Sequence, residues 1–380
     1  MSIKLHQFLA LTTVGIAVLT GNAQAALGAQ TSYSNLVVFG DSISDTGNVL
    51  SLTKFGAQDP FPSFPSAPGR FSDGIVWTEY LATGLGLPFG AVPANLLYYG
   101  STFGVIKTQP QGGTNYAYGG ARTGLSGSAG ATTGLIGELF NWNGAAFASS
   151  LTRAADPNAL YVVMAGANDL RDIRSDANLD APGRAAASGA IAQNIVNTVG
   201  LLAQAGAQHF LISSLPDLGK TPEASLLGLV PESTGVTLSF NAALAAYSAG
   251  FDAQFFGLTG RDLDIRTLDF YGLVERVAMD AQSNGGQVYG ITNITTPCLT
   301  PGAFSGQYFF ADATGSNCAV AAFSDPLHPS NKSHQLLGAL ALATATAPIT
   351  TAVPEPSAMA MLAAGLMLIG VAVRRTRKAA

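Results

Sequence analysis

Short, almost wholly apolar segments that alternate with helical patterns constrain the fold of this chain most. Residues 159–165 read Ala-Leu-Tyr-Val-Val-Met-Ala, a run typical of a parallel strand that is covered on both faces. Apolar residues then recur at helical spacing over 191–202, and residues 209–212 begin another strand. This order predicts an α/β fold, with one doubly wound parallel sheet of about five strands.

The other elements follow from the same patterns. Further strands are expected over 36–39 and 263–270, and further helices over 75–81, 236–256 and 274–281. Ser330 is expected to cap a last helix, whose apolar face includes Leu336, Leu337, Leu340 and Leu342. No internal repeat is found, so residues 26–350 are expected to form a single domain.

Composition narrows the classes of partner. Charged residues make up only 11% of the chain, well below the roughly one quarter that is usual in soluble domains. Without residues 1–25 and 354–380 the chain keeps 13 basic and 22 acidic residues, a net charge of −9. So acidic a body argues against binding to nucleic acid and against electrostatic docking on anionic lipid.

A candidate nucleophile follows the first apolar strand. Gly40-Asp41-Ser42 ends the run Leu-Val-Val-Phe abruptly, which predicts that Ser42 lies at the carboxyl edge of the sheet. Open α/β sheets bind their ligands at that edge. The alternative is an ordinary turn in which Asp41 and Ser42 cap the following helix.

A candidate base lies almost three hundred residues further on. A serine attacks a carbonyl only if a base takes its proton, and histidine titrates in the useful range. Asp325 and His328 lie three apart in a loop with Pro326 and Pro329, so the carboxylate can orient the imidazole locally. The sequence therefore predicts a catalytic triad of Ser42, His328 and Asp325.

Four sequence blocks resemble the GDSL (SGNH) family of serine esterases and lipases. They are Gly40-Asp41-Ser42-Ile43-Ser44, residues 115–121 (Asn-Tyr-Ala-Tyr-Gly-Gly-Ala), Gly166-Ala167-Asn168-Asp169, and Asp325-x-x-His328. The blocks occur in the family's order and span nearly all of the mature chain. Residues 69–74 and 240–244 also resemble segments of the plant-lipase-like branch. One departure is Ile43, where leucine is usual.

The resemblance implies a three-layer α/β fold, in which helices cover both faces of a parallel sheet of flavodoxin-like strand order. It also implies an oxyanion hole. Its donors would be the backbone N–H of Ser42, the N–H of Gly120 (or of Gly119) and the side-chain amide of Asn168. Residues 100–130 are rich in Gly, Thr and Ser, which is typical of a flexible surface loop, with Gly119 and Gly120 as exceptions. Glycine there permits the close backbone approach that an oxyanion donor needs.

The expected activity is hydrolysis of carboxylic esters, of lipids or of short acyl groups, through an acyl-enzyme. One alternative is a deacetylase of exported polysaccharide with the same triad, and another is a non-enzymatic surface or matrix protein. The absence of a Gly-x-Ser-x-Gly motif argues against an α/β-hydrolase. No His-Glu-x-x-His or cysteine cluster indicates a metal, and no cofactor is expected.

Several polar residues are expected to be structural. Asp41 and Asp45 are interpreted as loop-shaping residues, although Asp41 is placed to tune the site. Arg122 is interpreted as an exposed surface cation rather than a substrate contact. His334, which matches a second histidine of the family, and His209 in its strand are interpreted as structural rather than catalytic.

The two cysteines and the N-terminal segment indicate export. Lys4, an uncharged run over 8–19 and Ala23-Gln24-Ala25 predict a signal peptide cleaved after Ala25, since the run is too short to span a membrane. Cys298 and Cys318 then meet an oxidising compartment, where a disulfide is expected and two buried free thiols are the alternative.

The C-terminal residues 353–380 form a separate signal. Val-Pro-Glu-Pro precedes an uncharged stretch over 357–373, at the short limit for crossing a bilayer, and a basic cluster follows. This order resembles the PEP-CTERM sorting signal of certain Gram-negative bacteria. The resemblance implies transient anchoring through 357–373, processing by an exosortase-type enzyme, and release or attachment at the outer surface. The alternative is a permanent anchor facing the periplasm.

Overall fold

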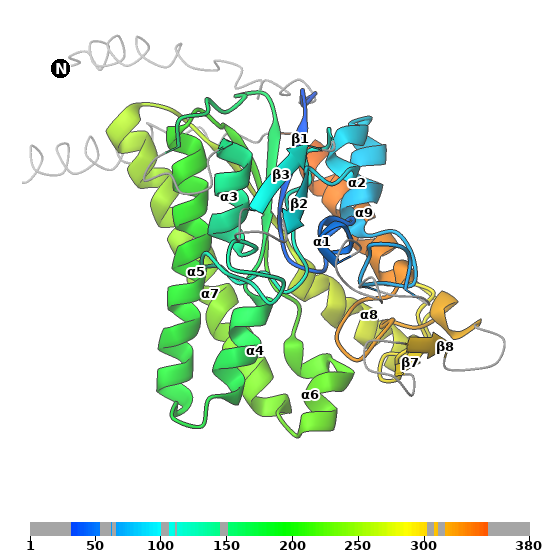
Figure 1. Ribbon diagram of the computed structural model, residues 1–380. Helices are drawn as coiled ribbons and strands as arrows, with labels where there is room; N and C mark the ends of the chain where they lie inside the picture. Colours follow the sequence, from blue (N-terminus) through cyan, green and yellow to red (C-terminus); the bar gives the residue numbers. More distant parts are fainter. Residues whose placement is uncertain are drawn as a thin grey trace, which may run out of the picture. The chain divides into compact units, whose positions relative to one another are not determined.

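The computed structural model describes residues 32–53, 62, 66–99, 106–110, 112–144, 151–301, 308–310 and 316–348 (Figure 1). The predicted signal peptide over 1–25 and the sorting segment over 353–380, with its apolar stretch 357–373, lie outside these residues. Among the helices of the described residues, none combines the length and the apolar character that crossing a bilayer requires.

The central sheet contains four parallel strands. They are β1 (Leu36–Gly40), β4 (Leu160–Met164), β5 (His209–Ser213) and β6 (Asp264–Leu268), in the spatial order β1-β4-β5-β6. Every residue of β1 and β4 is buried, as the continuous apolar runs predict for strands covered on both faces. The sheet is therefore the α/β arrangement that the alternation of strands and helices indicates.

Residues 114–118 extend the sheet beyond β1 in the place of a fifth strand. They run parallel to β1 without forming a regular strand. The Val38 N–H donates to the Thr114 carbonyl at 3.0 Å, and the Tyr116 and Tyr118 N–H groups donate to the carbonyls of Val38 (2.7 Å) and Gly40 (3.0 Å). With this segment outside β1, the sheet has the flavodoxin-like order. The prediction of a surface loop is wrong here, because residues 115–119 are buried.

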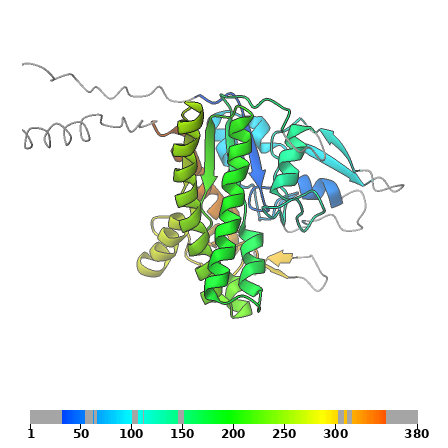
Figure 2. The ribbon, with the colours of Figure 1, turned by 90° about the vertical axis from the view of Figure 1, so that its left-hand side faces the viewer.

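Helices cover both faces of the sheet, and alternate residues of each strand point to the two sides. Val37 and Phe39 pack with helices α3 (Leu135–Asn143), α4 (Ala167–Ser175), α5 (Ala181–Gln204) and α7 (Val230–Thr259). Leu36 and Val38 pack with α2 (Trp77–Leu85), α8 (Phe270–Asn284) and α9 (Asn331–Thr346). The result is three layers, and Figure 2 shows α5 and α7 side by side over one face.

The helix boundaries follow the local capping chemistry. The Asp180 carboxylate accepts the Gly183 N–H at the start of α5, and the Ser330 hydroxyl accepts the Ser333 N–H at the start of α9. The last helix is thus capped as predicted. Helix α7 extends beyond the predicted 236–256, since Pro231 in its first turn fits a helix start and Gly260 ends it in the left-handed conformation.

Smaller elements connect these layers. They are α1 (Asn48–Thr53), α6 (Pro222–Leu227), the antiparallel pairs β2 (Asn95–Tyr99) with β3 (Ile106–Pro110) and β7 (Leu299–Pro301) with β8 (Tyr308–Phe310), and the 3-10 turns η1 (Pro88–Ala91), η2 (Leu218–Lys220) and η3 (Ser316–Ala319). A disulfide joins Cys298 to Cys318 just before the loop that carries Asp325 and His328.

Candidate active site

Ser42, His328 and Asp325 form a continuous hydrogen-bonded chain. The Ser42 Oγ lies 2.8 Å from His328 Nε2, and His328 Nδ1 lies 2.6 Å from Asp325 Oδ2. Although 286 residues separate the serine from the histidine, the fold brings both to the carboxyl edge of the sheet. A hydroxyl, an imidazole and a carboxylate in this order form the arrangement that activates a serine for nucleophilic attack.

The Asp325 loop is shaped by its own carboxylate. Asp325 Oδ1 accepts the backbone N–H groups of Leu327 (2.8 Å) and His328 (2.7 Å), which leaves Oδ2 for the imidazole. Burial alone would raise the pKa of Asp325, but the His328 charge and these hydrogen bonds outweigh burial and lower the pKa. Asp325 is therefore a carboxylate at neutral pH, as orientation of the histidine requires.

Packing fixes the imidazole ring from one side. The Phe71 ring lies with its centroid 5.2 Å from that of His328. Gly119 explains how Phe71 fits, because a Cβ at position 119 would lie 2.2 Å from the Phe71 ring. The glycine at 119 thus leaves space for the aromatic ring that packs against His328.

Ser42 lies on a tight turn rather than at a helix start. The Asp41 carbonyl accepts the N–H groups of Ser44 and Asp45, both at 3.0 Å. The next helix, α1, is capped by Asp45, whose carboxylate accepts the Gly47 and Asn48 N–H groups at 2.8 and 2.7 Å. The alternative in which Asp41 and Ser42 cap this helix is therefore not what the structure has.

Asn168 lines the same cavity as Ser42 and His328. Its Nδ2 donates to the Ala121 carbonyl at 3.0 Å, and its Oδ1 accepts from Arg171 Nη1 at 3.3 Å. An amide nitrogen carries two hydrogens, so one N–H remains for a ligand. The Ser42 backbone N–H likewise has no acceptor among the described residues.

The two glycines of the second block differ in what they offer. The Gly119 N–H already donates to Asp45 Oδ2 at 2.9 Å, so it is not available to an oxyanion. Gly120 adopts a left-handed conformation, with φ of +76°, and its N–H has no acceptor in the described part of the chain. Of the two candidates, Gly120 is the one with an unoccupied donor.

Glu138 is a buried acid that sequence reasoning missed. It projects from α3 and accepts the N–H of Gly40 (2.8 Å), which is the last residue of β1 and the first of Gly-Asp-Ser, and the N–H of Tyr118 (3.2 Å), the residue before Gly119. Burial raises the pKa of Glu138 well above its usual value. The signal was available in the sequence: a lone acid among Leu135, Leu139 and Trp142, which are all buried.

A second missed feature is a network of charges beside Asn168. Glu223 on α6 pairs with Arg171 (2.5 Å) and with the buried Arg174, both on α4. The Glu223 backbone N–H also donates to the Pro326 carbonyl at 2.8 Å, within the Asp325–His328 loop. The network therefore connects Asn168, through Arg171 and Glu223, to the loop that carries the base.

The remaining polar candidates take structural places. Arg122 pairs with Asp172 at 2.6 Å on the surface, and His209 Nδ1 lies 3.1 Å from Asp264 across β5 and β6. His334 is buried and accepts the Trp77 N–H at 3.2 Å, which joins α9 to α2. Burial lowers the pKa of His334 to about 3, so its ring is neutral.

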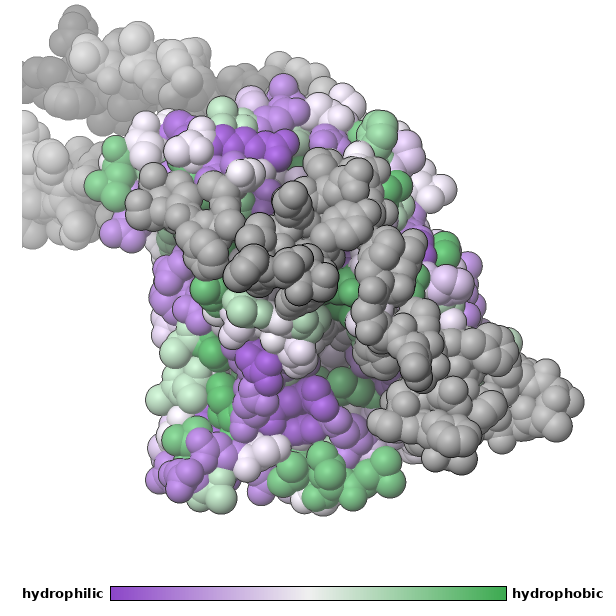
Figure 3. All heavy atoms as spheres, in the orientation of Figure 1, coloured by the Kyte–Doolittle hydropathy of each residue, from purple (hydrophilic) through white to green (hydrophobic). Residues whose placement is uncertain are grey.

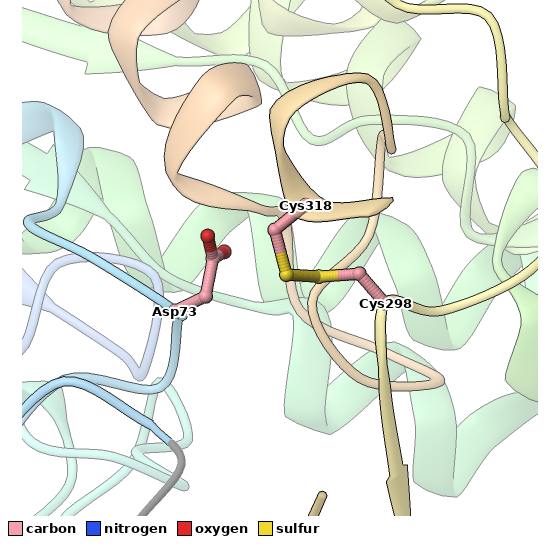
Figure 4. Close-up of side chains that lie close together, drawn as sticks. All are labelled: Asp73, Cys298 and Cys318. Atoms are coloured by element: carbon pink, nitrogen blue, oxygen red, sulfur yellow. A yellow bond between two sulfur atoms is a disulfide. The ribbon is translucent and has the colours of Figure 1, made fainter. Parts of the chain in front are cut away.

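One cluster has the composition of a metal site but not the chemistry. Asp73, Cys298 and Cys318 bring their ligand atoms within 4.8 Å of one another (Figure 4). The two sulfurs form a disulfide, whereas a metal requires thiolates. Asp73 Oδ1 instead accepts the backbone N–H of Asn331, the first residue of α9, at 2.8 Å.

Comparison with known proteins identifies the family. The profile of the family described as GDSL-like Lipase/Acylhydrolase matches residues 36–341. The chain belongs to this family. A second profile, the PEP-CTERM protein-sorting motif, matches residues 352–378.

Several individual proteins are also similar to this chain. The thermolabile hemolysin of Vibrio parahaemolyticus serotype O3:K6 is 25% identical over 315 residues, 80% of this chain and 61% of the hemolysin. The acetylesterase of Thermothelomyces thermophilus is 29% identical over 269 residues, 67% of this chain and 79% of the acetylesterase. This chain therefore spans less than two thirds of the hemolysin. The aryl esterase of M. smegmatis is 16% identical, with a TM-score of 0.31, over 62% of this chain and 83% of the esterase.

Proposed function

We propose that this protein is an exported serine hydrolase that cleaves carboxylic esters through an acyl-enzyme. The observation that carries the proposal is the chain from Ser42 Oγ through His328 to Asp325, with donor–acceptor distances of 2.8 and 2.6 Å. Membership of the GDSL-like lipase/acylhydrolase family supports the same reaction class.

The mechanism follows from the geometry. His328 Nε2 accepts the proton of Ser42 as the Ser42 oxygen attacks the ester carbonyl. The Ser42 and Gly120 N–H groups and the Asn168 amide stabilise the negative charge that develops on the carbonyl oxygen. The protonated His328 then gives its proton to the departing alcohol, and a water activated by the same ring releases the acid. Asp325 holds the imidazole in place in both steps.

Replacement of the nucleophile tests this proposal. Ser42→Ala is expected to abolish hydrolysis of a short p-nitrophenyl ester and labelling by a fluorophosphonate. Ser44→Ala is a matched control, because Ser44 is buried in the same turn and its hydroxyl accepts from Trp77 Nε1 at 3.1 Å instead of contacting His328. Full activity of Ser42→Ala would contradict the proposed mechanism.

The site of action is part of the proposal. The PEP-CTERM motif over 352–378 supports export, transient anchoring through the apolar stretch 357–373 and processing by an exosortase-type enzyme. We place the processed enzyme outside the cell or on the outer surface of a Gram-negative bacterium. Fractionation of cells that express the full chain with an epitope tag at its C-terminus tests this. The protein should accumulate outside the cell and should no longer carry the tag.

A deacetylase of exported polysaccharide is the second candidate. It is favoured by the acetylesterase among the relatives and by the sorting motif. Acetate release from acetylated polysaccharide, compared with hydrolysis of fatty-acyl esters, separates it from a lipase-like enzyme. A non-enzymatic surface protein would fail both assays and would not react with the fluorophosphonate.

A further inference from the structure

The cavity beside Ser42 has one wall formed by a single apolar stripe of α8. Phe270, Leu273, Val274 and Val277 recur at positions i, i+3, i+4 and i+7, so they share one face of the helix, and all four line the cavity. Ala278 extends this wall by one residue. Three of the stripe residues belong to the hydrophobic core on this side of the sheet, so the wall is held rigidly.

Apolar side chains from other segments line the same cavity. Ile294 precedes the disulfide-linked segment, Ala322 and Leu327 flank or belong to the loop that carries His328, and Leu336 lies on α9. Ser42 and His328 line the cavity too. An acyl group attached to the Ser42 oxygen therefore has apolar surface within the same enclosure.

Four polar side chains of the lining are already engaged inside the protein. The Ser333 hydroxyl donates to the Ala322 carbonyl and the Thr221 hydroxyl to the Leu218 carbonyl, both at 2.7 Å. Lys220 pairs with Glu275 at 3.3 Å, and Arg171 pairs with Glu223. These four groups are therefore not free to bind sugar hydroxyls, whereas a hydrocarbon chain needs no hydrogen-bond partner.

The size of the cavity suits a chain of intermediate length. Its volume is about 240 Å³. Since an apolar protein cavity of about 150 Å³ holds benzene, a carbon atom needs roughly 25 Å³, and this cavity accommodates on the order of ten carbons. An acetyl group would leave most of the space empty.

We infer that this cavity binds the acyl chain of the substrate and that the enzyme prefers esters of medium-chain fatty acids, of roughly six to ten carbons. The inference rests on the proposed function and specifies its substrate class. It favours a fatty-acyl ester over acetylated polysaccharide.

A series of p-nitrophenyl esters from acetate to palmitate, below micelle-forming concentrations, tests the inference with the full chain. The value of kcat/KM should rise by up to about fourfold for each methylene that becomes buried. It should stop rising near eight to ten carbons, where the cavity is full. Equal or higher kcat/KM for acetate than for octanoate would overturn the inference.

Filling the cavity provides the decisive variant. Ala278→Phe should lower the ratio of octanoate to acetate kcat/KM by about tenfold or more, because the ring occupies space meant for the chain. Val274→Phe, at a half-buried position, tests the same wall if Ala278→Phe does not fold. Met279→Phe is the matched control: Met279 is the next residue of α8, 63% exposed, and should leave the ratio unchanged.

The outcomes separate this inference from the proposed function. Hydrolysis of acetate with no gain from longer chains, or an unchanged ratio in a folded Ala278→Phe or Val274→Phe variant, overturns the acyl-chain assignment alone. No hydrolysis of any ester and no fluorophosphonate labelling of Ser42 overturns the proposed function, and the acyl-chain assignment with it.

Discussion

At the scale of single residues, the Asn168 amide is held at both ends, by the Ala121 carbonyl and by Arg171. In the proposed mechanism, Asn168→Ala removes a donor to the developing oxyanion and should lower kcat by about 100- to 1,000-fold. Thermal unfolding of the variant is the control, because a catalytic loss without a large change in Tm separates the role of the donor from a folding defect.

Arg171 donates a hydrogen bond to the oxygen of the Asn168 amide. Its replacement should therefore lower kcat less than the replacement of Asn168 itself. Arg171→Ala should lower kcat about tenfold with little change in KM for short esters, since the amide remains but is less well oriented. Arg122→Ala is the matched control, because the Arg122 side chain pairs with Asp172, the residue after Arg171 in α4, and forms no hydrogen bond with Asn168 among the described residues. A fall in kcat of equal size in both variants would contradict a specific role for Arg171.

Asp41 has one carboxylate oxygen without a partner among the described residues, and burial raises the pKa of this group from 3.8 to about 6. Between these values the folded protein keeps a proton that the unfolded chain has lost, so stability falls as pH rises through this window. Above pH 6 the full penalty is present, roughly 3 kcal/mol.

Urea unfolding of the wild type and of Asp41→Asn between pH 4 and pH 7.5 measures this effect. The stability of the wild type relative to the variant should decrease as pH rises from about 4 to about 6 and then level off. A difference that does not depend on pH would show that Asp41 does not titrate in this way.

At the scale of elements, the disulfide closes a segment with a sequence separation of 20 residues directly before the Asp325–His328 loop. Its removal by Cys298→Ser with Cys318→Ser should lower the free energy of unfolding by about 3 kcal/mol, because the unfolded chain gains freedom. Denaturant unfolding under oxidising and reducing conditions measures the change. An identical transition midpoint in both conditions would contradict it.

Some elements could be predicted from their sequence and others could not. Strands β1 and β4 are covered on both faces, so their apolar runs are distinctive. Residues 114–118 take the edge position beside β1 through backbone hydrogen bonds, and they lie in a stretch rich in glycine. Because those bonds are independent of side-chain type, composition alone suggested a surface loop.

The same physical distinction applies to the site. The convergence of Ser42, Asp325 and His328 was predictable because a serine after a strand and a histidine near an aspartate form recognisable local patterns. Glu138 and Glu223 act through contacts with segments far away in the chain, and only the folded structure specifies those neighbours. The family resemblance favoured Gly120 over Gly119 as the donor, and the contact that occupies the Gly119 N–H comes from Asp45, far away in the chain.

At the scale of the whole molecule, residues 32–347 form one compact unit that contains the sheet, the helices on its faces and the site. The fragment 32–347 should therefore unfold in a single cooperative transition. Its kcat/KM for p-nitrophenyl butyrate should agree with that of the full chain within about twofold, since every described contact of the site lies inside the fragment. Calorimetry and steady-state kinetics on both proteins check this.

The surface of this unit carries an apolar patch over α6. Figure 3 shows apolar side chains gathered over α6, where Leu226 and Leu227 are 76% and 57% exposed. Their neighbour Ser225 lines the cavity beside Ser42. The exposed apolar residues of α6 therefore follow directly, along the chain, a residue of the cavity lining.

The separation of 286 residues between Ser42 and His328 has a consequence for when hydrolysis can begin. In the proposed mechanism, a nascent polypeptide that ends before residue 328 has the Ser42 hydroxyl but lacks the His328 imidazole that would activate it. By the same mechanism, neither half of a nicked chain would hydrolyse an ester by itself. The appearance of chromophore from a reporter ester would therefore report the rate of refolding. The first turnover would require that the segments carrying Ser42 and His328 are already in contact.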